Sequence, residues 1–361
     1  MPPTIDPLAP GANRSTRSAR STRSARASRV GRAARAAALV AVLAGAVAGG
    51  CGRGATGSTE GAGSSTDPGG TAVVATTATP TTRATRVEPT GPVAFTTTTM
   101  TFTDTTRGTV ARPPLPASPV RVLRTTVRVP DGPGPWPLVV FGHGFAVSPT
   151  TYTTLLDGLA AAGFAVAAPD FPGSSSALAG RPDEHDLQDE PCDLLLVAQQ
   201  VQAAGAATDG SGPLAGRVQA GPVGLGGQSD GATAAAFAAL TSTCPGPPVG
   251  AVVAFSAKPA PPRAGLDPAD YPALVAITGT ADEVNPASET RALFDEFPSR
   301  AWLVSTAGEG HLAPSTTSPH LAAITAVIVD VLRAALDDDP TATDRIATDA
   351  SGPGLTLETH P

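Results

Sequence analysis

Short, almost entirely apolar runs recur through the middle of the chain and are separated mostly by helical patterns. The runs cover residues 137–141, 164–168, 223–225, 249–255, 273–277 and 301–304. The helical patterns cover residues 151–162, 192–204, 231–240 and 321–336. Continuously apolar strands that alternate with helices are typical of a parallel sheet covered on both faces. We therefore predict an α/β fold with a mostly parallel central sheet and helices on both faces.

Two earlier segments differ, because their polar and apolar residues alternate. Thr98 to Thr103 and Val120 to Val129 have the period of strands with one solvated face. With these strands included, the catalytic domain is predicted to span residues 96–337. The segment that follows, residues 338–361, is acidic and rich in Thr, Pro and Gly. We expect it to be a disordered tail.

The first fifty residues have the features of an export signal. Eight arginines recur at every third residue from Arg14 to Arg35, and the uncharged apolar stretch Ala36 to Ala48 follows them. This stretch is shorter than the roughly 20 residues that a bilayer span requires, and it fits the apolar core of a signal peptide. It ends in Val-Ala-Gly-Gly-Cys51, which resembles the lipobox of bacterial lipoproteins. We expect residues 1–50 to be the signal peptide and Cys51 to carry a lipid that anchors the protein to the outer face of the cell membrane. Ordinary cleavage nearby and an uncleaved anchor are the alternatives.

The chain after this signal is acidic and begins with a segment of low complexity. Residues 51–95 are rich in Gly, Ser, Thr and Ala without a hydrophobic period, so we predict a flexible tether. The formal charge of the whole chain is −7, but without the first 35 residues 16 basic and 30 acidic residues remain. Such a body binds phosphates poorly, which argues against a nucleic-acid partner.

Two cysteines remain besides Cys51. Cys192 and Cys244 form an even pair in a chain that we expect to be exported to an oxidising compartment. A disulfide between them is a candidate, and two buried free thiols are the equal alternative.

The motif Gly227-Gln-Ser229-Asp-Gly231 lies between a predicted strand and a predicted helix. In the pattern G-x-S-x-G this context matters, because the tight turn forces the serine into a strained backbone conformation while the glycines let other backbone come close. A chain with 39 glycines matches the bare pattern easily, so the strand-turn-helix context carries the prediction. We predict Ser229 to be a nucleophile.

A serine hydroxyl requires a base within hydrogen-bond reach and a third group that orients this base. Asp282 and His311 each follow a predicted strand, in the order Ser, Asp, His that this fold uses. Because carboxyl ends of parallel strands meet at one sheet edge, all three are expected on the same edge. Glu283 is the alternative acid and His320 the alternative base; the glycine-rich turn before His311 favours His311.

The other histidines and the oxyanion donors are assigned from their loops. His360 lies in the predicted tail, and His185 lies in a polar run that we interpret as a solvated loop. His143 belongs to Gly142-His-Gly-Phe145, after a predicted strand, where it shapes the turn. In this fold that loop supplies one backbone N–H for an oxyanion and the residue after the nucleophile supplies the other. We therefore expect the donors to be Phe145 and Asp230.

Together, five motifs resemble those of α/β-hydrolases related to chlorophyllases, platelet-activating-factor acetylhydrolases, dienelactone hydrolases and cutinase-like polyester hydrolases. The motifs are Gly142-His-Gly-Phe145, Phe164-Ala-Val-Ala-Ala-Pro-Asp170, Gly227-Gln-Ser-Asp-Gly231, Gly279-Thr-Ala-Asp282 and Gly310-His311. By position, the resemblance implies a triad of Ser229, Asp282 and His311. In the polyester hydrolases an aromatic residue matching Phe145 also clamps the substrate. Asp230 stands where that branch commonly has methionine, which speaks against polyester activity.

These residues predict an exported serine hydrolase that cleaves small or polymeric carboxylic esters through an acyl-enzyme. An amidase or peptidase with the same triad, and an inactive surface-binding protein with this fold, are the alternatives. No pattern for a phosphate loop or a metal site is evident, so we expect no cofactor. The segments 256–272 and 173–190 are too polar to form a large lid or an acyl tunnel. We therefore expect an open site that prefers short acyl groups of about two to six carbons.

Overall fold

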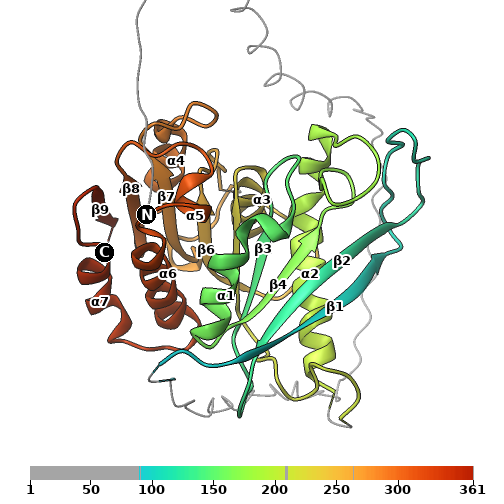
Figure 1. Cartoon of the computed structure of the whole chain (residues 1–361), viewed down its shortest axis with the longest axis horizontal. Helices are drawn as coiled ribbons and strands as arrows, with labels where there is room; N and C mark the ends of the chain where they lie inside the picture. Colours follow the sequence, from blue (N-terminus) through green and yellow to red (C-terminus); the bar gives the residue numbers. More distant parts are fainter. Residues whose placement is uncertain (1–88, 90, 208–209, 263, 361) are drawn as a thin grey trace, which may run out of the picture. The chain divides into compact units, whose positions relative to one another are not determined.

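One nine-stranded sheet forms the centre of the part of the chain that the structure describes (Figure 1). The structure is a computed structural model, and it describes residue 89 and residues 91–207, 210–262 and 264–360. The strands are β1 (Phe95–Asp104), β2 (Arg121–Pro130), β3 (Leu138–Gly142), β4 (Ala165–Asp170), β5 (Val223–Gln228), β6 (Val249–Phe255), β7 (Ala273–Gly279), β8 (Ala301–Thr306) and β9 (Leu355–His360). The predicted signal peptide (1–50), Cys51 and nearly all of the predicted tether (51–95) lie outside the described residues.

The sheet has a parallel centre and an antiparallel strand or pair at each edge. Its order is β1-β2-β4-β3-β5-β6-β7-β8-β9, and the six strands from β4 to β8 in this order pair in parallel. β1 and β2 form one antiparallel edge, and β9 forms the other by pairing with β8. Every residue of β3, β4, β5 and β7 is buried, which explains why these strands are continuously apolar rather than alternating.

Helices cover both faces of the sheet. The helices are α1 (Thr153–Ala161), α2 (Glu190–Gly205), α3 (Asp230–Leu240), α4 (Ala287–Asp295), α5 (Ala313–Thr316), α6 (Leu321–Leu336) and α7 (Ala342–Asp349). Buried side chains of α2, α3 and α4 share one hydrophobic core with one face, and those of α1, α6 and α7 share a second core with the other face. This arrangement confirms the predicted α/β fold.

The prediction of a disordered tail over residues 338–361 is wrong for the residues up to His360. This segment forms α7 and β9, so the folded domain extends past residue 337. Ile346 of α7 is 1% exposed, and Leu357 of β9 pairs with Val304 of β8. Arg345 also donates to Asp330 of α6 at 2.9 and 2.7 Å. The prediction was wrong because it was based on the average composition of the segment, whereas a few buried apolar residues are enough to fold a segment that is polar on average.

Two connections of the domain lie where a lid could be inserted, and in their described residues neither contains more than a brief 3₁₀ helix. Between β6 and β7, the described residues contain one brief 3₁₀ helix, η3 (Pro268–Asp270). Between β4 and α2, the chain contains the 3₁₀ helix η2 (Glu184–Gln188). This second connection is held by Arg121 of β2, which is buried and forms ion pairs with Asp186 at 2.8 Å and Asp193 at 2.5 Å. A buried charged network of this kind holds a polar loop in one place.

Candidate active site

Ser229 occupies a strained turn between β5 and α3. Its backbone has φ 56° and ψ −117°, a conformation that is costly for a residue with a side chain. Its N–H donates to the carbonyl of Phe255 at the end of β6. The glycines on either side have no room for side chains: a Cβ on Gly227 would lie 2.3 Å from Gly231, and a Cβ on Gly231 would lie 2.2 Å from the carbonyl oxygen of Gly142. The tight packing of backbone around this turn holds Ser229 at the carboxyl end of β5.

Asp282 and His311 form a hydrogen-bonded pair on two neighbouring loops. Asp282 follows β7 and His311 follows β8, and Nδ1 of His311 lies 2.8 Å from Oδ2 of Asp282. The other carboxylate oxygen of Asp282 accepts from the backbone N–H groups of Val284 and Asn285, both at 2.9 Å. Burial by itself would raise the pKa of Asp282, but the hydrogen bond from His311 and these two N–H donors outweigh it and lower the pKa. Asp282 is therefore a carboxylate that can orient His311 and stabilise its protonated form.

The loop that carries His311 is attached to the turn that carries Ser229. Gln228, directly before Ser229, donates from Nε2 to the carbonyl oxygen of His311 at 3.2 Å, and Ser256 donates to the same oxygen at 3.3 Å. The pKa of Asp230, directly after Ser229, is raised mainly by burial, while the charges of Lys258 and His311 act in the lowering direction. The residues on both sides of Ser229 thus interact with His311.

The loop after β3 packs against Ser229. A Cβ on Gly144 would lie 2.5 Å from Oε1 of Gln228 and 3.3 Å from Cβ of Ser229, so only glycine fits here. Within the described part of the chain, the backbone N–H of Phe145 has no hydrogen-bond partner. The N–H of Asp230 belongs to the first turn of α3, where an α-helix offers it no internal acceptor. Both predicted oxyanion donors therefore lie on segments that meet at Ser229.

The remaining histidines lie in other surroundings. His143 is fully buried: its Nε2 accepts from the N–H of Phe171 at 3.0 Å, so its Nδ1 carries the proton and donates to the carbonyl of Gly144 at 2.8 Å. Burial lowers the pKa of His143, which keeps this ring neutral. His185 is exposed beside Asp183, His320 precedes α6 close to Gly354, and His360 bonds to the carbonyl of Phe297.

Two residues at the site were missed by the sequence analysis. Tyr152, at the start of α1, is fully buried; its hydroxyl accepts from the N–H of Gly144 at 3.1 Å and donates to Oε1 of Gln228 at 2.9 Å. Because Gln228 in turn donates to His311, one chain of hydrogen bonds connects the predicted oxyanion loop, the nucleophile turn and the histidine loop. We call this chain the Tyr152–Gln228 relay. The only sequence signal for these two residues is the position of Gln228 inside the motif around Ser229.

Cys192 and Cys244 form a disulfide. Cys192 is in α2 and Cys244 lies in the turn after α3, with a Cα–Cα distance of 5.5 Å. Of the two alternatives that the sequence left open, the structure has the bridged one.

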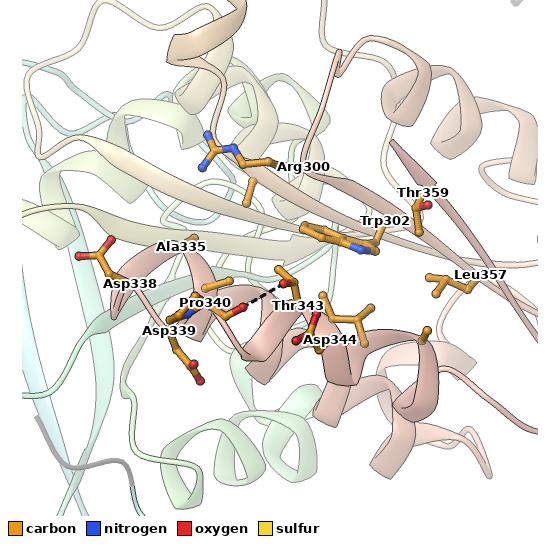
Figure 2. A pocket seen from close by; sticks show the side chains of 14 residues that line it. Arg300, Trp302, Ala335, Asp338, Asp339, Pro340, Thr343, Asp344, Leu357 and Thr359 are labelled. Carbon is orange, nitrogen blue, oxygen red and sulfur yellow. Dashed lines mark hydrogen bonds between the residues drawn. The ribbon is translucent and has the colours of Figure 1, made fainter. Parts of the chain in front are cut away.

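Two cavities differ in their relation to the candidate site. One, of about 570 Å³, is lined by Phe145 and Ala146 together with residues 111–113 and 181–185. The other, of about 640 Å³, lies near the first residues of β7 and β8, at the opposite end of these strands (Figure 2). Figure 2 shows Trp302 and Leu357 on β8 and β9, with Pro340 and Thr343 at the start of α7. None of the predicted site residues lines this second cavity.

Two further findings concern metal binding and the membrane, and both hold for residue 89 and residues 91–207, 210–262 and 264–360. No group of three or more His, Cys, Asp and Glu side chains there could hold a metal ion. Within the same residues, no helix combines the length and the apolar character required to cross a membrane.

Comparison with known proteins establishes the family. The chain matches the model of the alpha/beta hydrolase family over residues 139–360, more than half of its length. It therefore belongs to the alpha/beta hydrolase family, and this membership indicates a hydrolase. No curated protein gives a significant match.

Proposed function

We propose that this protein is a serine hydrolase that cleaves carboxylic esters, with Ser229 as nucleophile, His311 as general base and Asp282 as the residue that orients His311. The observation that supports this most is the hydrogen-bonded Asp282–His311 pair, attached through Gln228 to the strained turn that carries Ser229. Family membership provides the hydrolase class, and the three residues provide the chemistry.

In the proposed reaction, Oγ of Ser229 attacks the ester carbonyl carbon while His311 takes the hydroxyl proton. The carbonyl oxygen becomes an oxyanion, which accepts hydrogen bonds from the N–H groups of Phe145 and Asp230. Collapse of this intermediate breaks the ester bond, and the leaving alcohol takes the proton from His311. Water then repeats the sequence on the acyl-enzyme, which releases the carboxylic acid and restores Ser229.

Covalent labelling with a fluorescent phosphonate tests this mechanism. The wild-type protein should be labelled, whereas Ser229→Ala should lose labelling and lose ester turnover by about 10⁴- to 10⁶-fold. Ser242→Ala is a matched control, because Ser242 follows the opposite end of α3, and it should be labelled like the wild type. Labelling that persists in Ser229→Ala would disprove the proposed nucleophile. Comparing the turnover of an ester with that of its anilide analogue distinguishes an esterase, which cleaves the ester faster, from an amidase.

We further propose that the site prefers short acyl groups of about two to six carbons. Neither the β4–α2 nor the β6–β7 connection provides an apolar helix in its described residues, and the cavity beside Phe145 is lined by several charged side chains. A methylene gains about 0.8 kcal/mol only where it is buried against apolar atoms. The measurement is kcat/KM for p-nitrophenyl esters from acetate to palmitate, and a maximum at twelve carbons or more would contradict this preference.

Export and lipid anchoring at Cys51 are a separate proposal that rests on the sequence of residues 14–51. The mature protein should partition into the detergent phase and carry acyl mass on Cys51. Cys51→Ser should release soluble protein or leave the precursor unprocessed. Native protein that partitions into the aqueous phase without acyl mass on Cys51 would contradict the anchor.

A further inference from the structure

The cavity of about 570 Å³ beside Phe145 is lined by charged side chains from two connections that are far apart in the sequence. Residues 111–113 come from the loop between β1 and β2, and residues 181–185 come from the connection between β4 and α2. Phe145 and Ala146 of the predicted oxyanion loop form another part of the wall. A group bound in this cavity would therefore lie next to the ester carbonyl that the proposed function places at Ser229.

Arg112 in this wall is buried without an acidic partner. It is 5% exposed, and its one hydrogen bond through the side chain runs from Nη1 to the carbonyl of Gly173 at 3.3 Å. Within the described part of the chain, no carboxylate lies within ion-pair distance of it. Arg121 provides the contrast: it is 1% exposed, but Asp186 and Asp193 neutralise it. A buried guanidinium is ordinarily paired with a carboxylate as Arg121 is, and Arg112 lacks such a directly paired carboxylate.

A second arginine in the same wall is also without an ion pair. Arg181 is exposed, and no carboxylate among the residues that the structure describes lies within 4 Å of it. Two guanidinium groups without carboxylate partners on one cavity match a planar anion, because each can donate two parallel hydrogen bonds to a carboxylate.

The two acidic residues of this wall, Asp183 and Glu184, interact with other ionisable side chains. Asp183 is already used by His185, because its Oδ1 accepts from the backbone N–H at 3.0 Å and lies 2.8 Å from Nδ1. These two contacts are the main causes of its lowered pKa, with a smaller contribution from the charge of Arg112. The negative charge of Glu184 acts on Asp230. Burial is the main cause of the raised pKa of Asp230, and Glu184 raises this pKa further. The charges of Glu184 and Asp230 therefore interact, and an anion in the cavity would be repelled by Glu184 and attracted by the arginines.

We propose that Arg112 and Arg181 form a subsite for a carboxylate group of the substrate, so that the enzyme prefers esters that carry a second, ionised acid group. This inference rests on the proposed esterase function. The chemical class comprises half-esters of dicarboxylic acids, with the carboxylate on the acyl part, and esters of hydroxy acids, with the carboxylate on the alcohol part. Ester hydrolysis itself is unchanged, and the subsite contributes binding.

Two matched substrate pairs test the subsite on the full-length protein. Monoethyl adipate is compared with its neutral carboxamide analogue, and 4-acetoxybenzoate is compared with 4-acetoxybenzamide. We expect kcat/KM for the carboxylate to exceed that of the amide by about tenfold in at least one pair, mainly through a lower KM. The preference should shrink in 0.5 M NaCl, because salt screens the attraction. Equal or lower kcat/KM for the carboxylate in both pairs would overturn the proposal.

Variants show whether the arginines cause the preference. Arg181→Gln should reduce the ratio of carboxylate to amide kcat/KM, and Arg181→Glu should reverse it. Because Arg112 is buried, Arg112→Gln is measured beside Arg112→Lys, which keeps the charge and should keep part of the preference. Glu184→Gln should increase the preference by removing a repelling charge. Arg291→Gln is the control, since Arg291 forms a surface ion pair with Glu358 on other elements and should have no effect.

The results separate this inference from the proposed function. Hydrolysis of the neutral esters without a carboxylate preference, or a preference that persists undiminished in both Arg181→Gln and Arg112→Gln, refutes the subsite alone. Failure to hydrolyse any ester, together with no phosphonate labelling, refutes the esterase and the subsite with it.

Discussion

The two ends of the parallel strands differ in what their loops hold together. At the carboxyl ends, hydrogen bonds of 2.8 to 3.2 Å join the loops that carry Gly144, Ser229, Asp282 and His311. At the opposite end, the larger cavity in Figure 2 has the indole of Trp302 and the side chains of Ile346 and Leu357 in its wall, and it contains none of the predicted catalytic residues. The size of a cavity is thus a poor guide to chemistry here. The first end should therefore determine turnover, and the second should determine stability.

The largest effect on turnover after the loss of the nucleophile is expected from Asp282→Asn. The amide keeps the size of the side chain but favours the wrong tautomer of His311, so turnover should fall by about 10⁴-fold. Steady-state hydrolysis of p-nitrophenyl butyrate measures this. The control is Glu283→Gln, the exposed neighbouring carboxylate, which should stay within about twofold of the wild type. If Glu283→Gln is inactive and Asp282→Asn is active, the acid assignment is wrong.

A smaller loss is expected from Tyr152→Phe, which interrupts the Tyr152–Gln228 relay. The N–H of Gly144 loses its acceptor and Gln228 loses a donor, so the oxyanion loop and the loop of His311 can shift relative to Ser229. We expect kcat to fall by about 10- to 100-fold while KM changes little. Affinity for a boronic acid that mimics the tetrahedral intermediate should fall with kcat.

Tyr271→Phe is the matched control for this change, because the chain has two tyrosines and Tyr271 packs edge to face against Phe297 outside the site. It should keep wild-type kcat. An equal loss of kcat in both tyrosine variants, or a loss confined to KM in Tyr152→Phe, would argue against a positioning role.

At the opposite end, Ile346→Ala should leave turnover within about twofold of the wild type. Ile346 is buried in the core between α7 and the sheet, so its truncation should lower the free energy of unfolding by about 2–4 kcal/mol. Denaturant titration and steady-state kinetics on the same preparation measure the two quantities. A tenfold loss of kcat in folded protein would show that the two ends are coupled.

The smallest effect concerns the proton on Glu190 of α2. Glu190 is fully buried, accepts from Ser174 at 2.6 Å, and has no positive partner among the described residues. Burial raises its pKa well above the usual 4.5. Above the unfolded value the folded protein therefore holds more protons than the unfolded chain, so the free energy of unfolding falls as pH rises until the folded carboxyl ionises.

Glu190→Gln cannot ionise and should lack this loss. Its stability relative to the wild type should increase from pH 5 to pH 8 by about 1.4 kcal/mol for each pKa unit of the shift that lies within this range. Denaturant titration at the two pH values checks the difference, with Glu289→Gln on α4 as a control. A constant difference between the two pH values would contradict the raised pKa.

The sequence predicted those parts of the fold in which burial restricts the choice of residues. β7 is buried along its whole length, and its residues 273–277 were recognisable because both faces admit only apolar side chains. α4 was missed because Thr290, Leu293 and Phe294 are its only buried residues and the rest of the helix is polar. β9 was missed because an edge strand pairs on one side and stays largely solvated.

The site, like the fold, has residues that the sequence could predict and residues that it could not. Ser229, Asp282 and His311 could be proposed because each follows a strand in a pattern that the chemistry requires, and their joint role stays a prediction. The role of Tyr152 could not be proposed in this way, because its hydroxyl contacts residues 8 and 76 positions away and its own neighbourhood resembles an ordinary helix start. A hydrogen bond between distant segments leaves no period in the local sequence.

The disulfide between Cys192 and Cys244 closes a covalent ring in the chain, with a sequence separation of 52. Ser229 lies within this ring, and so does the exposed turn Gly210–Pro213. If a protease cut that turn, the ring would open, but both fragments would stay covalently joined through the bridge, and Ser229 would remain attached to each. On a non-reducing gel the nicked and intact proteins would have the same mass apart from one water. If the protein is exported as proposed, a second cut rather than the first would determine how long it stays active.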